Sequence, residues 1–109
     1  MSSQGSPRSV FKRAIERGNF TVAEVVAREV GHITLEESLA LVVLAVEKAP
    51  GRRNRYLITW LRRLLERDEN LTIDEVVLAA SALAALGGRG HEQAVGILEG
   101  VAARSARRG

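Results

Sequence analysis

The chain has 109 residues, of which 46% are hydrophobic and 27% charged, and its formal net charge is +3. A chain of this length and composition can bury one core, which excludes a disordered protein. Cysteine is absent, and this excludes disulfides, thiolate metal sites and cysteine nucleophiles.

The longest strictly apolar run, residues 39–46, has eight residues, whereas a helix that crosses a bilayer needs about 20. The N-terminus has Ser, Gln, Gly and Pro where a secretory signal would need an apolar stretch. We therefore expect no membrane association and a cytoplasmic location, to which the absence of cysteine is also suited.

Residues 1–6 are mostly small and polar, so we expect a flexible N-terminal tail over residues 1–8. The first helix should begin near Pro7 or Ser9, because apolar residues recur with helical spacing from Val10 to Ile15. It should end at Gly18, since glycine readily adopts the left-handed conformation that closes a helix.

Three segments have a Thr followed three residues later by a Glu, which is the spacing of a capping box at a helix start. In a capping box the two side chains bond to each other's backbone N–H groups. The pairs are Thr21 with Glu24, Thr34 with Glu37, and Thr72 with Glu75. We predict a helix start at each.

The second predicted helix runs from Thr21 to Val30. The third, Thr34 to Lys48 or Ala49, has no polar side chain between Leu39 and Val46. A helix that is apolar on all sides belongs at the centre of a bundle, so we expect the others to surround it. We also expect it to be the segment with least to do with function.

Three more helices are predicted, over residues 52–67, 72–86 and 91–104, separated by turns rich in Gly, Asp and Asn. The buried stripe of the first comprises Leu57, Trp60, Leu61, Leu64 and Leu65. Residues 104–109 are read as a basic C-terminal tail. The expected fold is all-α: one domain, residues 9–103, with five to six antiparallel helices in a bundle or a small hairpin stack.

The segment from Ala14 to Val30 resembles the turn region of a tetratricopeptide repeat, with Gly18, the aromatic Phe20 and the small Ala23. Members of that family use the glycine and alanine for close helix packing and present a concave face to peptides. We carry over from this resemblance only a helical hairpin, without any binding residue.

Charge alternates along the chain: the net charge is +3 for residues 1–17, −3 for 18–50, +5 for 51–67, −4 for 68–88 and +2 for 89–109. On the fourth predicted helix, one row at three- and four-residue spacing combines arginines with two aromatic residues. This row, the candidate binding surface, comprises Arg53, Tyr56, Trp60, Arg63 and Arg67.

Two interpretations of this row remain open. In the first, the arginines contact phosphates and an aromatic ring stacks on a base. In the second, Trp60 belongs to the core and acidic neighbours pair with the arginines inside the fold.

Catalytic chemistry has little support in the sequence. His32 and His91 both stand at predicted turns, and His91-Glu92 lacks the second histidine of a zinc-binding motif. The cluster 87–90 lacks the Lys-Ser/Thr of a phosphate loop and is read as a turn. We therefore expect no enzyme activity, metal or cofactor.

The function predicted from the sequence is a small helical module for protein–protein contact, with self-association as one form of it. Either the Ala-rich segment 76–86 or the segment between Gly96 and Gly100 could supply a close-packing surface. The alternative is nucleic-acid binding by the Arg-rich fourth helix together with the basic tail.

Overall fold

The computed structural model describes residues 6–108, which form six α-helices and one 3-10 turn with no strand among them. The elements are α1 (Pro7–Glu16), α2 (Phe20–Val30), α3 (Leu35–Lys48), η1 (Pro50–Arg52), α4 (Arg53–Arg67), α5 (Ile73–Ala85) and α6 (His91–Arg108). The predicted all-α class is confirmed. None of the described helices is long and apolar enough to cross a bilayer.

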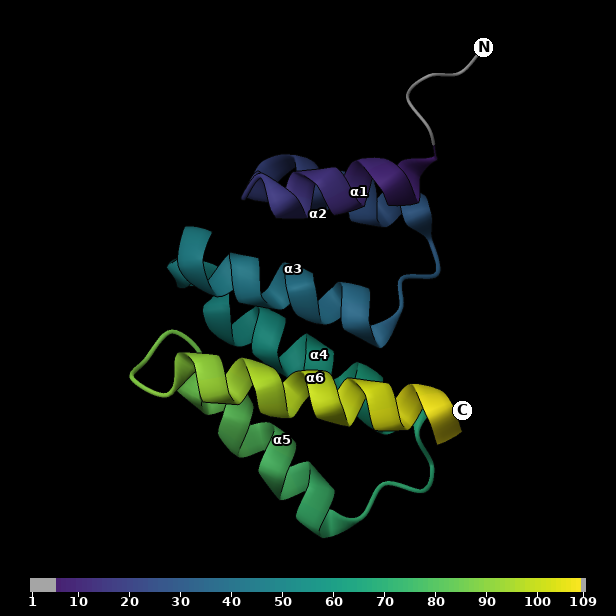
Figure 1. Ribbon diagram of the computed structural model, residues 1–109, viewed down its shortest axis with the longest axis vertical. Helices are drawn as coiled ribbons and strands as arrows, with labels where there is room; N and C mark the ends of the chain where they lie inside the picture. The colour runs from purple at the N-terminus through teal and green to yellow at the C-terminus, as the bar shows by residue number, and fades with distance from the viewer. Residues whose placement is uncertain (1–5, 109) are drawn as a thin grey trace.

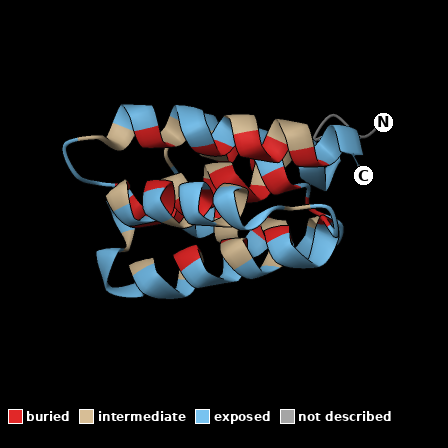
Figure 2. Cartoon of the chain, turned by 90° about the horizontal axis from the view of Figure 1, so that it is seen from below, coloured by how far each residue is buried: buried red, intermediate tan, exposed pale blue. Residues whose placement is uncertain are grey.

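The helices form three successive hairpins, α1–α2, α3–α4 and α5–α6, along a long axis of 48 Å (Figure 1). In Figure 1, α1, α3 and α6 form a front layer, α2 and α4 lie behind it, and α5 runs obliquely below α6. Helix α3 contacts α1, α2, α4 and α6, so its predicted central place is confirmed. Buried residues gather where the helices meet, while the outer faces are exposed (Figure 2).

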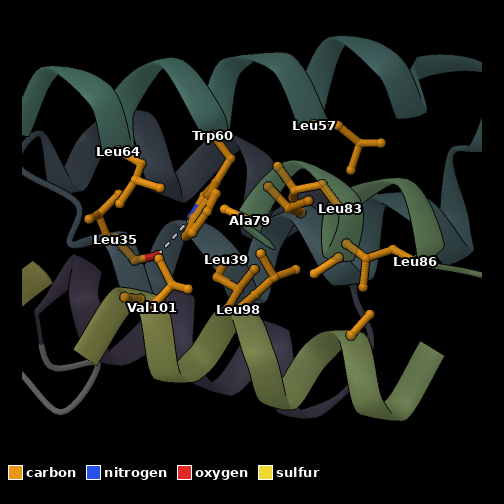
Figure 3. Close-up of a cluster of buried hydrophobic side chains, with 14 of the residues drawn as sticks. Leu35, Leu39, Leu57, Trp60, Leu64, Ala79, Leu83, Leu86, Leu98 and Val101 are labelled. Carbon is orange, nitrogen blue, oxygen red and sulfur yellow. Dashed lines mark hydrogen bonds between the residues drawn. The ribbon is translucent and has the colours of Figure 1, made fainter. Parts of the chain in front are cut away.

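The core has two clusters. The larger joins α3, α4, α5 and α6 around Trp60, Leu64 and Leu98, all with 0% exposure (Figure 3). The smaller joins α1, α2 and α3 around Phe11 and Ala23. Tyr56, which is partly buried, packs against both. Helix α3 therefore holds the two halves of the molecule together through opposite sides.

Two of the three predicted capping boxes are present. Thr34 accepts from the Glu37 backbone N–H at 3.0 Å and Thr72 from that of Glu75 at 3.2 Å, with both glutamates bonding back. The box predicted at Thr21 is wrong. Helix α2 begins one residue earlier, at Phe20, and its N-cap is Asn19.

Asn19 can take this role because its side-chain oxygen accepts from the Val22 N–H at 3.2 Å, and Asn is among the strongest N-cap residues. The earlier start places Phe20 on the helix, where the residue is buried, with 7% exposure. Glu24 is then free to bond elsewhere. The turn before α2 contains Gly18 at φ +69°, as the predicted helix end requires.

The predicted C-terminal tail is wrong for residues 104–108, which form the last turn of α6. Ser105 is buried there, and Arg108 bonds the buried carboxylate of Asp68 and the carboxylate of Glu75. These partners hold the last turn against the α4–α5 connection. At the other end, Pro7 and Arg8 belong to α1 instead of the predicted tail, and residues 1–5 lie outside the described part.

Candidate functional site

Trp60 cannot serve as a stacking platform. Its indole is 0% exposed, and Nε1 donates a hydrogen bond to the backbone oxygen of Leu35 at 3.0 Å (Figure 3). A buried indole N–H needs such a partner, and the Leu35 carbonyl supplies it at the first turn of α3. This side chain therefore belongs to the core, as the second interpretation expected.

Two arginines of the predicted row also bond within the fold, although to carbonyl groups and not to the expected carboxylates. Arg53 donates to the backbone oxygens of Ala84 and Leu86, at 2.8 and 3.1 Å. These carbonyls lie at the C-terminal end of α5, where a cation complements the helix dipole. Arg67 donates to the Ile33 oxygen at 2.7 Å.

Tyr56 donates its hydroxyl hydrogen bond to Glu24, which also pairs with Arg52 at 2.7 Å. Burial, and then the hydrogen bond to Glu24, raise the pKa of Tyr56 to about 12. The Tyr56 hydroxyl, followed by the Arg52 charge, holds the pKa of Glu24 below its usual value. Tyr56 thus ties α4 to α2. Within the predicted row, Arg63 has no hydrogen bond or ion pair to a described residue.

The five residues of the predicted row therefore do not form one open surface. An open surface is found instead on the opposite layer of the molecule. It is a groove of about 610 Å³ whose floor is α3 and whose walls are α1 and α6. We call it the front groove. It is lined by Ile15, Glu36, Leu39, Ala40, Val43, Leu44, Glu47, Val95, Glu99 and Ala103.

The front groove is apolar in its middle and acidic at its rim. Ala40 and Val43 on the floor are partly exposed, and they lie between Glu36 and Glu47 on the same face of α3. Glu99 stands on the α6 wall. Within the described chain these three glutamates are exposed and have no hydrogen bond or ion pair, and no basic residue lines the groove.

Glu37, the neighbour of Glu36, shows the contrasting case. Its carboxylate accepts from Arg8 and from the Thr34 N–H, and the Arg8 hydrogen bond is the main cause of its lowered pKa. Adjacent glutamates on one helix thus differ because Glu37 points to α1 and Glu36 to the groove. The carboxylates of the acidic rim therefore make no hydrogen bond or ion pair within the described fold.

Sequence reasoning missed this groove because it treated residues 39–46 as buried on every side. One signal was available: residues 36, 40, 43 and 47 follow three- and four-residue spacing, with small apolar residues between two glutamates. Whether that stripe is covered depends on the separation of α1 and α6, which no local pattern reveals.

Metal chemistry finds no support in the described residues, which contain no group of three or more His, Asp or Glu side chains placed to hold an ion. His91 has a local role: its Nδ1 accepts the Gly87 N–H at 2.8 Å in the turn before α6. No protein-family model, curated protein or solved structure matches the chain.

Proposed function

We propose that the protein is a non-catalytic, cytoplasmic protein–protein interaction module, and that its front groove binds an amphipathic helix with a basic rim. The observation that carries this proposal is the groove's combination of an apolar floor with three unpartnered carboxylates, Glu36, Glu47 and Glu99. Helix-in-groove recognition uses an apolar stripe for affinity, and complementary charge at the rim sets orientation and association rate.

The chemistry of the occupant follows from the lining. Ala40, Val43, Val95 and Ala103 offer small, partly exposed apolar surfaces, which suit Leu- or Ile-sized side chains on a docked helix. Lysine or arginine on both flanks of that helix would meet Glu36 and Glu47 at the two ends of the floor and Glu99 on the wall. An acidic helix would bring like charges together and be rejected.

The test is a titration of the isotope-labelled full-length protein with a designed, basic amphipathic peptide of about 15 residues. We expect amide shifts around Ala40, Val43 and Val95, in a binding reaction that weakens with salt. Changing Glu36, Glu47 and Glu99 together to Gln should lower the affinity by about threefold or more. The control is Glu29→Gln, on the exposed surface of α2 outside the groove.

Shifts elsewhere on the molecule, or equal affinity for a peptide of reversed charge, would contradict the proposal. So would a triple variant that binds as well as the control, because the rim would then have no part in recognition.

The nucleic-acid alternative has weaker support. Trp60 is buried, Arg53 and Arg67 are bonded to carbonyls, and Arg108 is bonded to Asp68. What remains for it are exposed or half-exposed arginines, such as Arg55 and Arg63, along hollows between α2 and α4. A mobility-shift measurement at low salt with single-stranded and duplex DNA and RNA tests it, and we expect no complex.

A further inference from the structure

The outer face of α4 has the chemistry that the front groove requires of its occupant. Arg55, Ile58, Arg62 and Leu65 are spaced by three, four and three residues, so they form one stripe along the helix. Ile58 is 58% exposed and Leu65 is 48% exposed; Leu65 was predicted to be buried. We call these four residues the α4 stripe.

The charged side chains of the α4 stripe, like those of the groove rim, have no bonding partner within the described chain. Arg55 and Arg62 are exposed and have no hydrogen bond or ion pair to any described residue. Ile58 lies between the two arginines and Leu65 lies beyond Arg62. Together the four residues make an exposed helical surface on which basic and apolar side chains alternate.

Other exposed apolar faces fit the groove less well. On α2, Val22 and Val25 lie beside Glu29, and on α5 Ile73 and Val77 lie beside Asp74. The exposed Glu66 lies near the α4 stripe as well, but two arginines outnumber it there, whereas α2 has only Arg28 and α5 has no basic residue. The Ala-rich side of α5 is used inside the fold, where Ala79 and Ala82 are buried.

The lengths of the two surfaces also agree. The groove floor extends from Glu36 to Glu47 and the stripe from Arg55 to Leu65. At 1.5 Å per residue, these separations are about 16 Å and about 15 Å along their helix axes. Ile58 can then pack on the floor beside Ala40 and Val43, with Arg55 toward one floor glutamate, Arg62 toward the other, and Leu65 beyond Arg62. The two arginines are about 10 Å apart along the helix axis, so their long side chains must reach outward to the glutamates.

We propose that the occupant of the front groove is the α4 stripe of a second copy of this chain; this inference rests on the proposed function. A copy cannot fill its own groove, because α4 lies in the layer behind α3, α1 and α6 (Figure 1). The contact joins two different surfaces, so each added copy leaves one groove and one stripe open. Such an association is head to tail and closes only if its rotation makes a ring.

The test is sedimentation velocity over a range of protein concentrations, with two variants that each disable one surface. Ala40→Lys places a cation on the groove floor, and Ile58→Lys places one in the stripe. Ala40→Lys sets like charge against the arginines of the stripe. Ile58→Lys replaces an apolar side chain of the contact with a charge that must lose its water. Each change should weaken self-association more than about tenfold. Val25→Lys is the matched control, since it adds the same charge at a 50% exposed position on α2 and should associate like the parent.

A mixture of the two variants gives a more specific test than either variant alone. The Ala40→Lys chain keeps an intact stripe and the Ile58→Lys chain an intact groove, so equal amounts should form a one-to-one dimer and nothing larger. A parent chain that stays monomeric at every concentration would overturn the inference, as would variants that do not pair when mixed. Association that persists in both variants would place the contact elsewhere and also overturn it.

The same variants separate this inference from the proposed function. Peptide binding is measured on Ile58→Lys, whose groove is intact and unoccupied by a second copy. If the designed peptide binds while the parent chain is monomeric, the groove function stands and the second copy is not its partner. If the parent chain associates, the peptide should dissociate it, because both compete for one groove. Failure of the peptide to do so would contradict the assignment of the contact to the groove.

Discussion

The front groove and the α4 stripe both combine exposed apolar residues with charged residues, but they are opposite in shape and in charge. In the groove, partly exposed apolar residues lie between Glu36 and Glu47, whereas in the stripe Arg55 and Arg62 alternate with the exposed Ile58 and Leu65. The groove is hollow because α1 and α6 do not touch above α3, whereas the stripe is the rounded outside of one helix. The difference between them teaches that net charge along a helix says little until each residue's direction is known.

Helix α4, which has fifteen residues, has arginines of both kinds. Arg53 and Arg67 bond to carbonyls of other segments, while Arg55 and Arg62 are exposed and have no partner in the described chain. If this division is correct, substitutions on the two sides should separate stability from association.

The largest difference is expected between two adjacent leucines. Leu64 is fully buried, so Leu64→Ala should lower the free energy of unfolding by about 2–5 kcal/mol. Leu65 is 48% exposed, and Leu65→Ala should change it by less than about 0.5 kcal/mol while weakening self-association. Denaturant titration followed by Trp60 fluorescence measures the first quantity and sedimentation the second. Equal destabilisation by both changes would show that the outer face of α4 is part of the core.

A smaller contrast is expected between two arginines. Arg67→Ala removes the donor to the Ile33 carbonyl and should cost about 1 kcal/mol, with no effect on the stripe. Arg62→Ala should leave the free energy of unfolding within about 0.5 kcal/mol and weaken association. Thermal unfolding of the two variants, beside sedimentation, checks both statements. The reverse pattern would exchange the roles assigned to the two sides of the helix.

The smallest effect concerns acid stability. The carboxylates of Asp68 and Glu24 have pKa values lowered chiefly by hydrogen bonds from Arg108 and Tyr56, respectively. A carboxyl whose pKa is lower in the folded chain stabilises it above the unfolded pKa, and that contribution is lost as the pH falls through the folded pKa. Stability should therefore be level above about pH 5 and decline below about pH 4. Denaturant midpoints across this range measure it, and Arg108→Ala should make the decline shallower.

Much of the fold could be predicted because its signals are local. Thr34 with Glu37 and Thr72 with Glu75 lie within one helical turn of each other, so their spacing suffices to predict the helix starts. Thr21 and Glu24 have the same spacing, yet Glu24 bonds to Tyr56 and Arg52, which lie 32 and 28 residues away. Local spacing cannot reveal a competitor so distant in the chain.

The groove, the stripe and the C-terminal turn were harder to predict, because the contacts that define them join residues far apart in the sequence. Residues 104–108 look like a tail until Arg108 is seen beside Asp68, 40 residues earlier. The floor of the groove looks like core until α1 and α6 are found to be apart. For α4, the sequence pattern indicates the row of arginines and aromatics, but the side of the helix that faces outward is the neighbouring one, which contains Ile58 and Leu65.

The division of the core into two clusters also has a spectroscopic consequence. Trp60, the single tryptophan, lies in the larger cluster, and the smaller cluster around Phe11 and Ala23 has none. Tryptophan emission therefore reports on one half of the molecule, whereas far-ultraviolet circular dichroism reports on all the helices. Because α3 and Tyr56 belong to both halves, the two signals should change together, as in a single cooperative transition. A dichroism change that precedes the emission change would instead assign the α1–α2 hairpin an unfolding step of its own.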